Sequence, residues 1–414
     1  MTKKPSLGAI FLTVFLDLLG FGIVLPFLAE EARDGFHTSA FVGTLLAAVY
    51  SLMQFLFVPV WGRLSDRIGR RPVMVLSVFA TFVGMTCLGL ALGWAGSVVW
   101  LFAARIWSGI ATANLGTASA YIADVTPPEE RARGMGLIGM AFGLGFILGP
   151  GIGGALSDIT INGRHGPVAC FVAAGLSVVN FIWVQIGLAE SLPKEKRSVS
   201  TRRLVPLDIK AAREAFAMPG VAQAVLVNFL IVLSFTNLDQ TFRFYNKDVF
   251  QMTPLQTGLV LAAVGVVAAG VQGGVVRRMS KRYGEAKLIV IGVVLQAIAF
   301  GGIAWSPAAG IWALFVSMGL LAVGNGLSAP STSAFVSKRA DPKAQGNTLG
   351  TNQSASSLAR TFGPALGGWL YGEIGPRSPY LSAAAGMVVA LFFAVRLLQI
   401  PPSADAATEP ANAA

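Results

Sequence analysis

Two charged side chains lie inside long apolar runs of this sequence. Asp17 falls about ten residues into the run 8–29, and Arg105 about seven residues into the run 98–121. A charge in hydrocarbon costs several kcal/mol unless it is paired, hydrated or neutral. Because desolvation favours the neutral form of a carboxyl group, Asp17 is a candidate proton carrier and Arg105 its candidate partner. The alternatives are a permanently paired Asp17 and an Arg105 that donates only to backbone carbonyls.

A short basic segment, WGRLSDRIGRRP at residues 61–72, separates two long uncharged runs. Because so few residues connect the runs, the two must lie antiparallel. Gly62 and Gly69 predict tight turns of the backbone, and Pro72 suits the first turn of the next helix. The arginines of such a loop hold it on the cytoplasmic side of a membrane. Asp66 is the lone acid among them, which a generic basic loop would not need.

More charged residues follow the fourth apolar run, between Asp124 and Arg133. We expect acids and bases of the two charged segments to form a cytoplasmic network of ion pairs. Exposed pairs are individually weak, so their use would be to hold one conformation closed. Solvated charges without a shared role are the alternative. The residues predicted for this conformational latch are Gly62, Asp66, Arg67, Gly69, Arg70, Arg71, Asp124 and Arg131.

The fifth apolar run, residues 134–157, is unusually rich in glycine. It holds nine glycines between Gly134 and Gly154. Glycine lets membrane helices approach closely, and a glycine–proline pair weakens the helical hydrogen-bond ladder. The order GFILGPGIGG therefore predicts a helix that can kink and that lies close to a neighbour. Its key positions are Gly145, Gly149, Pro150, Gly153 and Gly154.

The elements that must position these residues are membrane-spanning helices. Of the 414 residues, 12% are charged, whereas soluble proteins carry about twice that fraction. Runs of about 20 apolar residues are long enough to cross a bilayer. The predicted spans are 8–29, 41–61, 73–93, 98–121, 134–157, 168–189, 220–242, 255–276, 286–305, 311–335, 347–371 and 379–399. The predicted fold is therefore an all-α membrane protein with twelve transmembrane helices.

The positions of lysine and arginine predict the orientation of these helices. With the N-terminus inside, 24 of the 31 basic residues fall in cytoplasmic segments, 4 in outer loops and 3 within spans. We therefore expect a multi-pass protein of the cell inner membrane with both termini in the cytoplasm. The first run has no A-x-A-like cleavage site, so we expect it to be a retained helix.

The two halves of the chain repeat one pattern. GPGIGG at 149–154 and GPALGG at 363–368 lie 214 residues apart, and the polar segment 191–218 divides the spans six and six. Such repeats predict two pseudo-symmetric six-helix bundles with a substrate site between them. The predicted domains are a bundle at 1–190, a cytoplasmic linker at 191–218, a second bundle at 219–402 and a disordered tail at 403–414.

Polar side chains elsewhere in the spans are candidates for lining a substrate cavity. Asp239 and Arg243 lie four residues apart on the seventh span, so an intrahelical ion pair is the simplest expectation. Arg360 lies deeper, in the most polar span, without an obvious local partner. The cavity candidates are Gln54, Asn114, Asn228, Asn237, Gln296, Gln353 and Arg360.

Several of these motifs resemble those of one family, the major facilitator superfamily. GRLSDRIGRRP at 62–72 resembles the signature of its loop between helices two and three. Arg105 followed by Gly109 resembles its helix-four motif, whose arginine is linked to proton coupling. GFILGPGIGG at 145–154 resembles the helix-five motif of its antiporters. YIADVT and ERARG within 121–134 resemble its tetracycline exporters.

The resemblance implies a proton-coupled antiporter that exports a small amphipathic drug or metabolite, with Arg105 in proton coupling. The cost of burying its charge makes Asp17 the candidate proton carrier. Tetracycline exporters carry acids in helices three and nine and a histidine in helix eight. The corresponding residues here are Gly84, Gln296 and Ala268. A generic multidrug or metabolite exporter is therefore favoured over a tetracycline exporter.

Two other classes of function remain open: a nutrient symporter or facilitator on the same fold, and a non-transporting membrane sensor. An enzyme is not expected, because the sequence has no phosphate-binding loop and its two histidines lie far apart in outer loops. We expect no cofactor, no metal and no nucleic-acid partner. The expected partners are a small-molecule substrate, protons and the lipid bilayer, and the expected state is a monomer.

Overall fold

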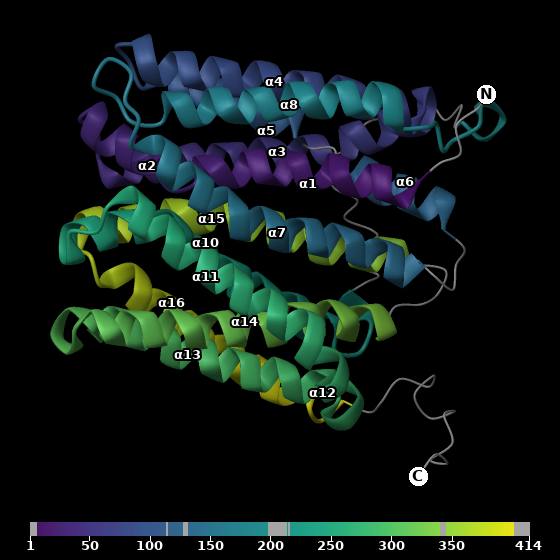
Figure 1. The fold of residues 1–414 in the computed structure, drawn as a ribbon. Helices are drawn as coiled ribbons and strands as arrows, with labels where there is room; N and C mark the ends of the chain where they lie inside the picture. The colour runs from purple at the N-terminus through teal and green to yellow at the C-terminus, as the bar shows by residue number, and fades with distance from the viewer. Residues whose placement is uncertain are drawn as a thin grey trace. The chain divides into compact units, whose positions relative to one another are not determined.

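The structure is a computed structural model that describes residues 6–112, 115–126, 131–197, 213, 216–339 and 345–400. Most of these residues lie in helices, which Figure 1 labels in chain order. Within the described ranges the only strand-like pairing is one isolated bridge between Ile161 and Arg164. The predicted all-α fold is confirmed.

The first half of the chain forms long apolar helices joined by short connections. They are α1 (Leu7–Val24), α2 (Leu28–Glu30), the π-helical turn η1 (Glu31–Gly35), α3 (Ala40–Ile68), α4 (Arg70–Trp94), α5 (Val99–Ala111), α6 (Leu115–Val125), α7 (Arg131–Ser157) and α8 (Pro167–Gly187). A short 3-10 turn, η3 (Lys194–Lys196), follows them.

The second half repeats this organisation. Its helices are α10 (Val221–Phe250), α11 (Pro254–Gly270), the π-helical turn η4 (Val271–Val275), α12 (Val276–Tyr283), α13 (Glu285–Ala309), α14 (Ile311–Arg339), α15 (Gln345–Glu373) and α16 (Ser378–Leu397). Each predicted span coincides with one of these helices or with consecutive helices.

Among the described residues, nine helical stretches are long and apolar enough to cross a membrane. The other predicted spans correspond to α5 with α6, to α7 and to α15. α7 contributes a shorter apolar stretch, Gly143–Ser157. A multi-pass helical membrane protein is therefore confirmed, while the count of twelve spans stays a prediction.

The basic segment after the second span is helical and not a loop. α3 continues through it to Ile68 and α4 begins at Arg70, so the connection is Gly69 alone. Gly69 has a φ of +108°, a backbone conformation that favours glycine. The predicted turn at Gly62 was wrong: Gly62 lies inside α3, because its neighbours keep the helical hydrogen bonds and one glycine does not end a helix. Pro72 lies in the first turn of α4.

Residue contacts divide the chain into two compact units. Unit 1 comprises 1–206, 237–266 and 360–379, and unit 2 comprises 207–236, 267–359 and 380–414. These units cut across α10, α11, α15 and α16. They therefore group residues differently from the domains predicted from the repeat, and the division into two six-helix bundles stays a prediction.

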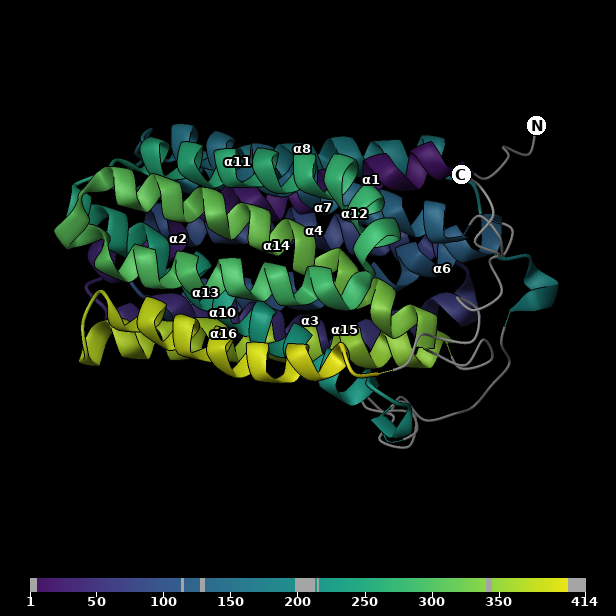
Figure 2. The ribbon, with the colours of Figure 1, turned by 90° about the horizontal axis from the view of Figure 1, so that it is seen from below.

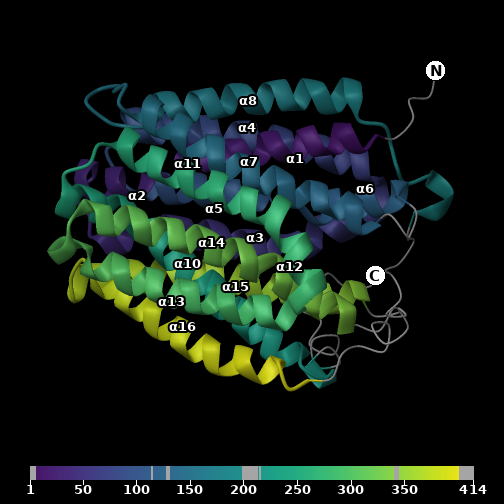
Figure 3. The ribbon, with the colours of Figure 1, turned by 60° about the horizontal axis from the view of Figure 1, so that its bottom comes forward.

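Unit 1 is held together by packed apolar helices. α4 packs along α8, and α1 packs against α7 and α8, as Figures 1 and 3 show. Leu88 and Leu92 of α4 and Cys170 of α8 are fully buried in this core. Small residues such as Ala169 and Cys170 let the helix axes come close, which suits packing in a membrane.

In unit 2, α13 and α14 lie along each other, as Figure 2 shows. A methyl group built at Gly292 would lie 2.6 Å from the carbonyl oxygen of Gly324, and one at Gly324 would lie 2.8 Å from that of Gly292. The two glycines therefore face each other, and the backbones of the two helices touch there.

Candidate functional site

Tyr50, in the middle of α3, is the centre of a group of buried polar side chains in unit 1. The guanidinium carbon of Arg105 lies 4.2 Å from the centroid of the Tyr50 ring, a cation–π contact. The ring also stacks on Phe21 of α1, with centroids 5.2 Å apart. The hydroxyls of Tyr50 and Thr112 are 2.7 Å apart and share a hydrogen bond. Tyr50 therefore connects α1, α3 and the end of α5.

Gly109, four residues after Arg105 on α5, lies against the backbone of α3. A side chain at Gly109 would overlap the backbone carbonyl of Tyr50. The glycine thus lets α5 approach α3 closely at this point. Arg105 lies one helical turn earlier on the same face, so its guanidinium comes over the Tyr50 ring.

Arg105 is buried, with only 2% of its surface exposed. Its Nε donates to the carbonyl oxygen of Leu46 at 3.3 Å. Its Nη1 has no hydrogen-bond partner among the residues that the structure describes. A buried N–H without a partner costs free energy, so donation to a backbone carbonyl satisfies this guanidinium only in part. The Nη1 donor is therefore open to another group.

Asp17 lies in the middle of α1 and is half-buried. Its Oδ1 is 3.4 Å from Nδ2 of Asn180 on α8. Tyr50 lies within electrostatic range of both Asp17 and Arg360. Asp17 lies one helical turn before Phe21, whose ring stacks on Tyr50, and Arg105 contacts the same tyrosine from α5. The role of Asp17 and Arg105 in proton coupling stays a prediction.

The glycines of α7 form a seam against α1. A methyl group built at Gly145 would lie 3.0 Å from Leu18, and one at Gly149 would lie 2.6 Å from Cα of Gly22. One at Gly153 would overlap the carbonyl oxygen of Ile23 (these three α7 glycines are called the glycine seam below). The two backbones therefore touch over two helical turns, and no side chain fits between them.

The other face of α7 packs on the start of α11. A methyl group at Gly154 would lie 2.7 Å from the carbonyl oxygen of Pro254, and one at Gly258 would overlap the carbonyl of Pro150. At Gly143, in the same helix, no atom of the described residues lies within 4 Å of such a methyl group. α7 therefore lies between α1 and α11, and its glycines differ in how tightly they are packed.

Arg70 is the centre of the charged groups around the α3–α4 connection. Its Nη1 donates to Asp66 Oδ1 at 2.5 Å and to Ser65 Oγ at 2.7 Å. Its Nε donates to Asp124 Oδ2 at 3.1 Å, and its backbone N–H donates to Glu190 Oε1 at 2.8 Å. Only 7% of Arg70 is exposed. The guanidinium therefore binds α3 and the end of α6, and the backbone N–H of the same residue binds the segment after α8.

Other residues predicted for the latch have different positions. Arg71 donates to the backbone carbonyl of Gln185, at 2.7 Å. Arg67 lies in the last turn of α3. The side chain of Arg131 lies outside the described residues, so its predicted place in the network stays untested. The latch role of the whole set also stays a prediction.

Sequence reasoning missed Glu190, which follows α8 and accepts from the start of α4. A side chain at Gly69 would overlap its carboxylate. Arg197 lies 3.6 Å from Glu190 Oε2. Nothing in the local spacing could have paired residue 190 with residue 70. The signal that could have found it is a lone acid directly after a transmembrane helix, on the side where basic residues gather.

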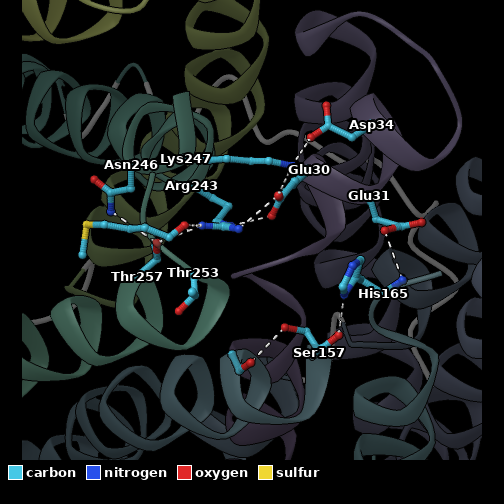
Figure 4. A network of polar contacts seen from close by, with 12 residues as sticks. Glu30, Glu31, Asp34, Ser157, His165, Arg243, Asn246, Lys247, Thr253 and Thr257 are labelled. Atoms are coloured by element: carbon cyan, nitrogen blue, oxygen red, sulfur yellow. Dashed lines mark hydrogen bonds and ion pairs between the residues drawn. The ribbon is translucent and has the colours of Figure 1, made fainter. Parts of the chain in front are cut away.

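A second group of charges lies at the opposite end of α3 from Gly69, and Figure 4 shows part of it. Arg243 of α10 binds Glu30 through two nitrogens, with Nε–Oε2 at 2.5 Å and Nη2–Oε1 at 3.0 Å. Lys247 lies 2.8 Å from Glu30 and 2.6 Å from Asp34. The predicted pair of Arg243 with Asp239 was wrong: Asp239 accepts from its neighbour Gln240, because the guanidinium reaches a partner 213 residues away.

The same group of charges extends to α15 through Tyr371. Arg33 binds both oxygens of Asp248, at 2.7 and 3.0 Å, and the Tyr371 hydroxyl donates to Asp248 at 2.7 Å. Its three cations balance its three carboxylates. We call this the distal charge cluster, with members Glu30, Arg33, Asp34, Arg243, Lys247 and Asp248.

The uncharged cavity candidates mostly form bonds between helices. In unit 2, Asn228 donates to Ser356 at 2.7 Å, and Gln296 donates to Ser328 at 2.9 Å. In unit 1, Asn237 donates to the Pro379 carbonyl at 3.1 Å, and Gln54 approaches the Thr112 carbonyl at 3.4 Å. Gln353 is exposed, and Asn114 lies outside the described residues. Their role in a cavity stays a prediction.

The chain is similar to proteins of one family along most of its length. The profile of the Major Facilitator Superfamily matches residues 10–307 and 228–414. The tetracycline resistance protein of class C from Escherichia coli is 34% identical over 88% of this chain and 89% of its own length. The class E protein of the same organism is 32% identical over 86% of each chain. The crystal structure of the human organic anion transporter MFSD10 (TETRAN) has a TM-score of 0.72 at 26% identity, over 94% of this chain and 98% of that one.

Proposed function

Because the chain belongs to the major facilitator superfamily, a family of membrane transporters and not of enzymes, we propose that it is a proton-coupled antiporter. It exports a small amphipathic compound across the inner membrane in exchange for protons. Both termini lie in the cytoplasm, and the protein works as a monomer.

The observation that carries this proposal is the arrangement around Tyr50. A buried guanidinium, Arg105, lies over the Tyr50 ring, and a half-buried carboxyl group, Asp17, lies on α1 one turn before Phe21, which stacks on the same ring. A scaffold or sensor has no need to bear the desolvation cost of both groups. A transporter can use such groups. Protonation of the carboxyl group changes the charge balance at the centre of the bundle, and therefore the relative free energies of two conformations.

The identity of the exported compound has two candidates. Tetracycline is the first, because tetracycline resistance proteins are relatives of this chain, but the acids and the histidine of those exporters correspond here to uncharged residues. An organic anion is the second candidate, because the structurally similar human MFSD10 is an organic anion transporter. The unpartnered Nη1 of Arg105 favours an organic anion, since an anionic group is the natural acceptor for such a donor.

Flux measurements test the proposal directly. Inverted membrane vesicles containing the protein are given an acidic interior and offered tetracycline, ethidium or fluorescein as probes. We expect uptake of at least one probe against its concentration gradient, and loss of this uptake when a protonophore collapses the pH gradient. Uptake driven by the opposite gradient would instead indicate a symporter, and no uptake of any tested probe would count against export of these classes.

A further inference from the structure

The distal charge cluster is built around one bidentate pair, Glu30 with Arg243. Glu30 is the last residue of α2, directly beyond α1, and Arg243 lies near the end of α10. Both side chains are largely buried, with 12% and 7% exposed. A bidentate guanidinium–carboxylate pair is among the strongest charge-assisted contacts in proteins. It joins two segments that are 213 residues apart in the chain.

Arg243 also holds the start of α11. Its Nη1 donates to the carbonyl of Met252 at 2.5 Å and to the hydroxyl of Thr257 at 3.3 Å. Figure 4 shows the guanidinium between these groups and Glu30. One side chain therefore ties the region beyond α1 to the first turn of α11.

Both of these elements also pack against α7, one on each face. Gly153 of α7 touches Ile23 of α1, and Gly154 touches Pro254 of α11. α7 therefore lies between α1 and α11 at this end of the spans. The Glu30–Arg243 pair joins the segment after α1 to α10, and Arg243 in turn holds the start of α11. If the pair opens, the start of α11 loses its connection, through Arg243, to the segment after α1.

We propose that the Glu30–Arg243 pair is an ionic lock that stabilises the conformation in which α7 and α11 are in contact. The lock must open and close in each transport cycle, at the end of the spans that the sequence predicts to face outward. It acts opposite the latch around Arg70. Its opening and closing in a transport cycle depend on the transport function proposed above. Its stabilisation of one conformation does not depend on that function.

The charge count supports a reversible lock. The six members of the distal charge cluster sum to zero, and Glu30 has a second cationic partner in Lys247, whose side chain is 40% exposed. An exposed partner of this kind keeps the carboxylate partly neutralised when Arg243 moves away. The cost of opening is therefore smaller than for an isolated buried pair.

Glu31 is a matched control next to Glu30 in the chain. It is only 5% exposed, and it accepts from the backbone N–H of His165 at 3.2 Å and lies 3.6 Å from Arg164. Figure 4 shows it turned away from Arg243. Its partners precede α8, so its loss weakens the same region of the chain without touching α10 or α11.

Disulfide cross-linking between α7 and α11 reports the locked conformation without any substrate. A methyl group built at Gly151 would lie 4.0 Å from Cβ of Ala262, within the span of about 3.5–4.5 Å that a disulfide requires. The double variant Gly151→Cys/Ala262→Cys, with the exposed Cys87 changed to Ser, is oxidised in membranes, and the initial rate of cross-linking is measured. Cys170 is buried and is left in place.

Glu30→Gln keeps the shape of the side chain and removes its charge. We expect cross-linking about tenfold slower, as the loss of a hydrogen bond to a charged group predicts. Arg243→Gln should have a similar effect. The combined variant should be slowed by less than the product of the two single effects, because both changes remove the shared Glu30–Arg243 contact. Glu30→Asp, which keeps the charge, covers the case in which Glu30→Gln does not fold, and should slow cross-linking less.

Glu31→Gln should cross-link at the parental rate. The lock is refuted if folded Glu30→Gln and Arg243→Gln also cross-link at that rate. It is equally refuted if Glu31→Gln slows cross-linking as much as Glu30→Gln does, since the effect would then be general loosening of the helix end. A protein that moves no substrate would refute the proposed transport, and the lock would still be judged from the cross-linking.

Discussion

At the scale of single residues, the site consists of charges that share partners. Arg105 uses a tyrosine ring and one carbonyl, and Arg70 uses two carboxylates and a serine. A charged side chain with several polar partners can lose one of them, for example when a carboxyl group takes up a proton, and still keep the others. Substitution of such an acid by its amide therefore removes one charge and keeps the shape of the side chain.

Asp17→Asn imitates a permanently protonated carboxyl group. We expect proton-driven accumulation of substrate to be abolished, because the side chain can no longer exchange a proton between the two conformations. Substrate binding should persist and should depend less on pH than in the parent protein. The measurements are uptake into inverted vesicles under an imposed pH gradient and proton release when substrate is added to purified protein.

Asp158→Asn is the control, since Asp158 is exposed. It should leave both measurements unchanged. Uphill transport with normal proton release in Asp17→Asn would show that the carrier is elsewhere, and Asp239 would be the next acid to change.

Asp66→Asn takes one of two carboxylates from the nearly buried Arg70. We expect normal expression and transport about tenfold slower, as the loss of a charge-assisted hydrogen bond predicts. Glu195→Gln, an exposed acid after α8, should transport normally. If well-expressed Asp66→Asn transports at the parental rate, Asp66 is not part of a latch.

At the scale of elements, α7 is in backbone contact with two neighbours, α1 and α11. Its glycines are not equivalent: the glycine seam has no room for a side chain, whereas Gly143 faces open space. Replacement of glycine with leucine in these two settings separates packing from helix propensity, because the change in propensity is the same in both.

Gly149→Leu should abolish coupled transport or leave it leaky. Overpacking a contact of this kind costs about 1–3 kcal/mol, and α1 would have to move from α7 to relieve it. Gly143→Leu should keep transport near the parental rate. The comparison is made by coupled uptake and by passive proton leak in the same vesicles. Equal behaviour of the two variants would mean that the seam has no special role.

At the scale of the whole molecule, the sequence predicts the spans better than it predicts the partners. Apolar runs report burial in lipid wherever they occur, so the positions of the helices follow from local composition. Arg243 shows the opposite case. Its nearest acid in the sequence is Asp239, but its bond is with Glu30, and no local spacing encodes a contact over 213 residues.

Tyr50 was missed for a related reason. An aromatic residue in a transmembrane helix is normally packing, and only the approach of α5 at Gly109 gives this ring its cationic partner. At Gly62 the motif was recognised, but the turn predicted there was wrong. Glycine permits a turn but does not force one, so the helix runs on to Gly69.

The orientation of the molecule is also open to a direct measurement. In a Cys87→Ser background, Gly96→Cys should react with a membrane-impermeant thiol reagent in intact cells, because the segment before α5 is predicted to face outward. Arg282→Cys, at the end of α12, should react only after the membrane is permeabilised. Both residues are exposed. The reverse pattern would invert the predicted topology.

The contact between α7 and α1 has a consequence for how this protein tolerates change. Where two backbones touch, the contact does not depend on the surrounding side chains. Any side chain placed on the glycines of the contact would push the two helices apart. In a library of all single substitutions selected for transport, Gly22, Gly149 and Gly153 should each accept nothing but glycine. Variants with altered substrate range should therefore arise around Tyr50 and leave this contact untouched.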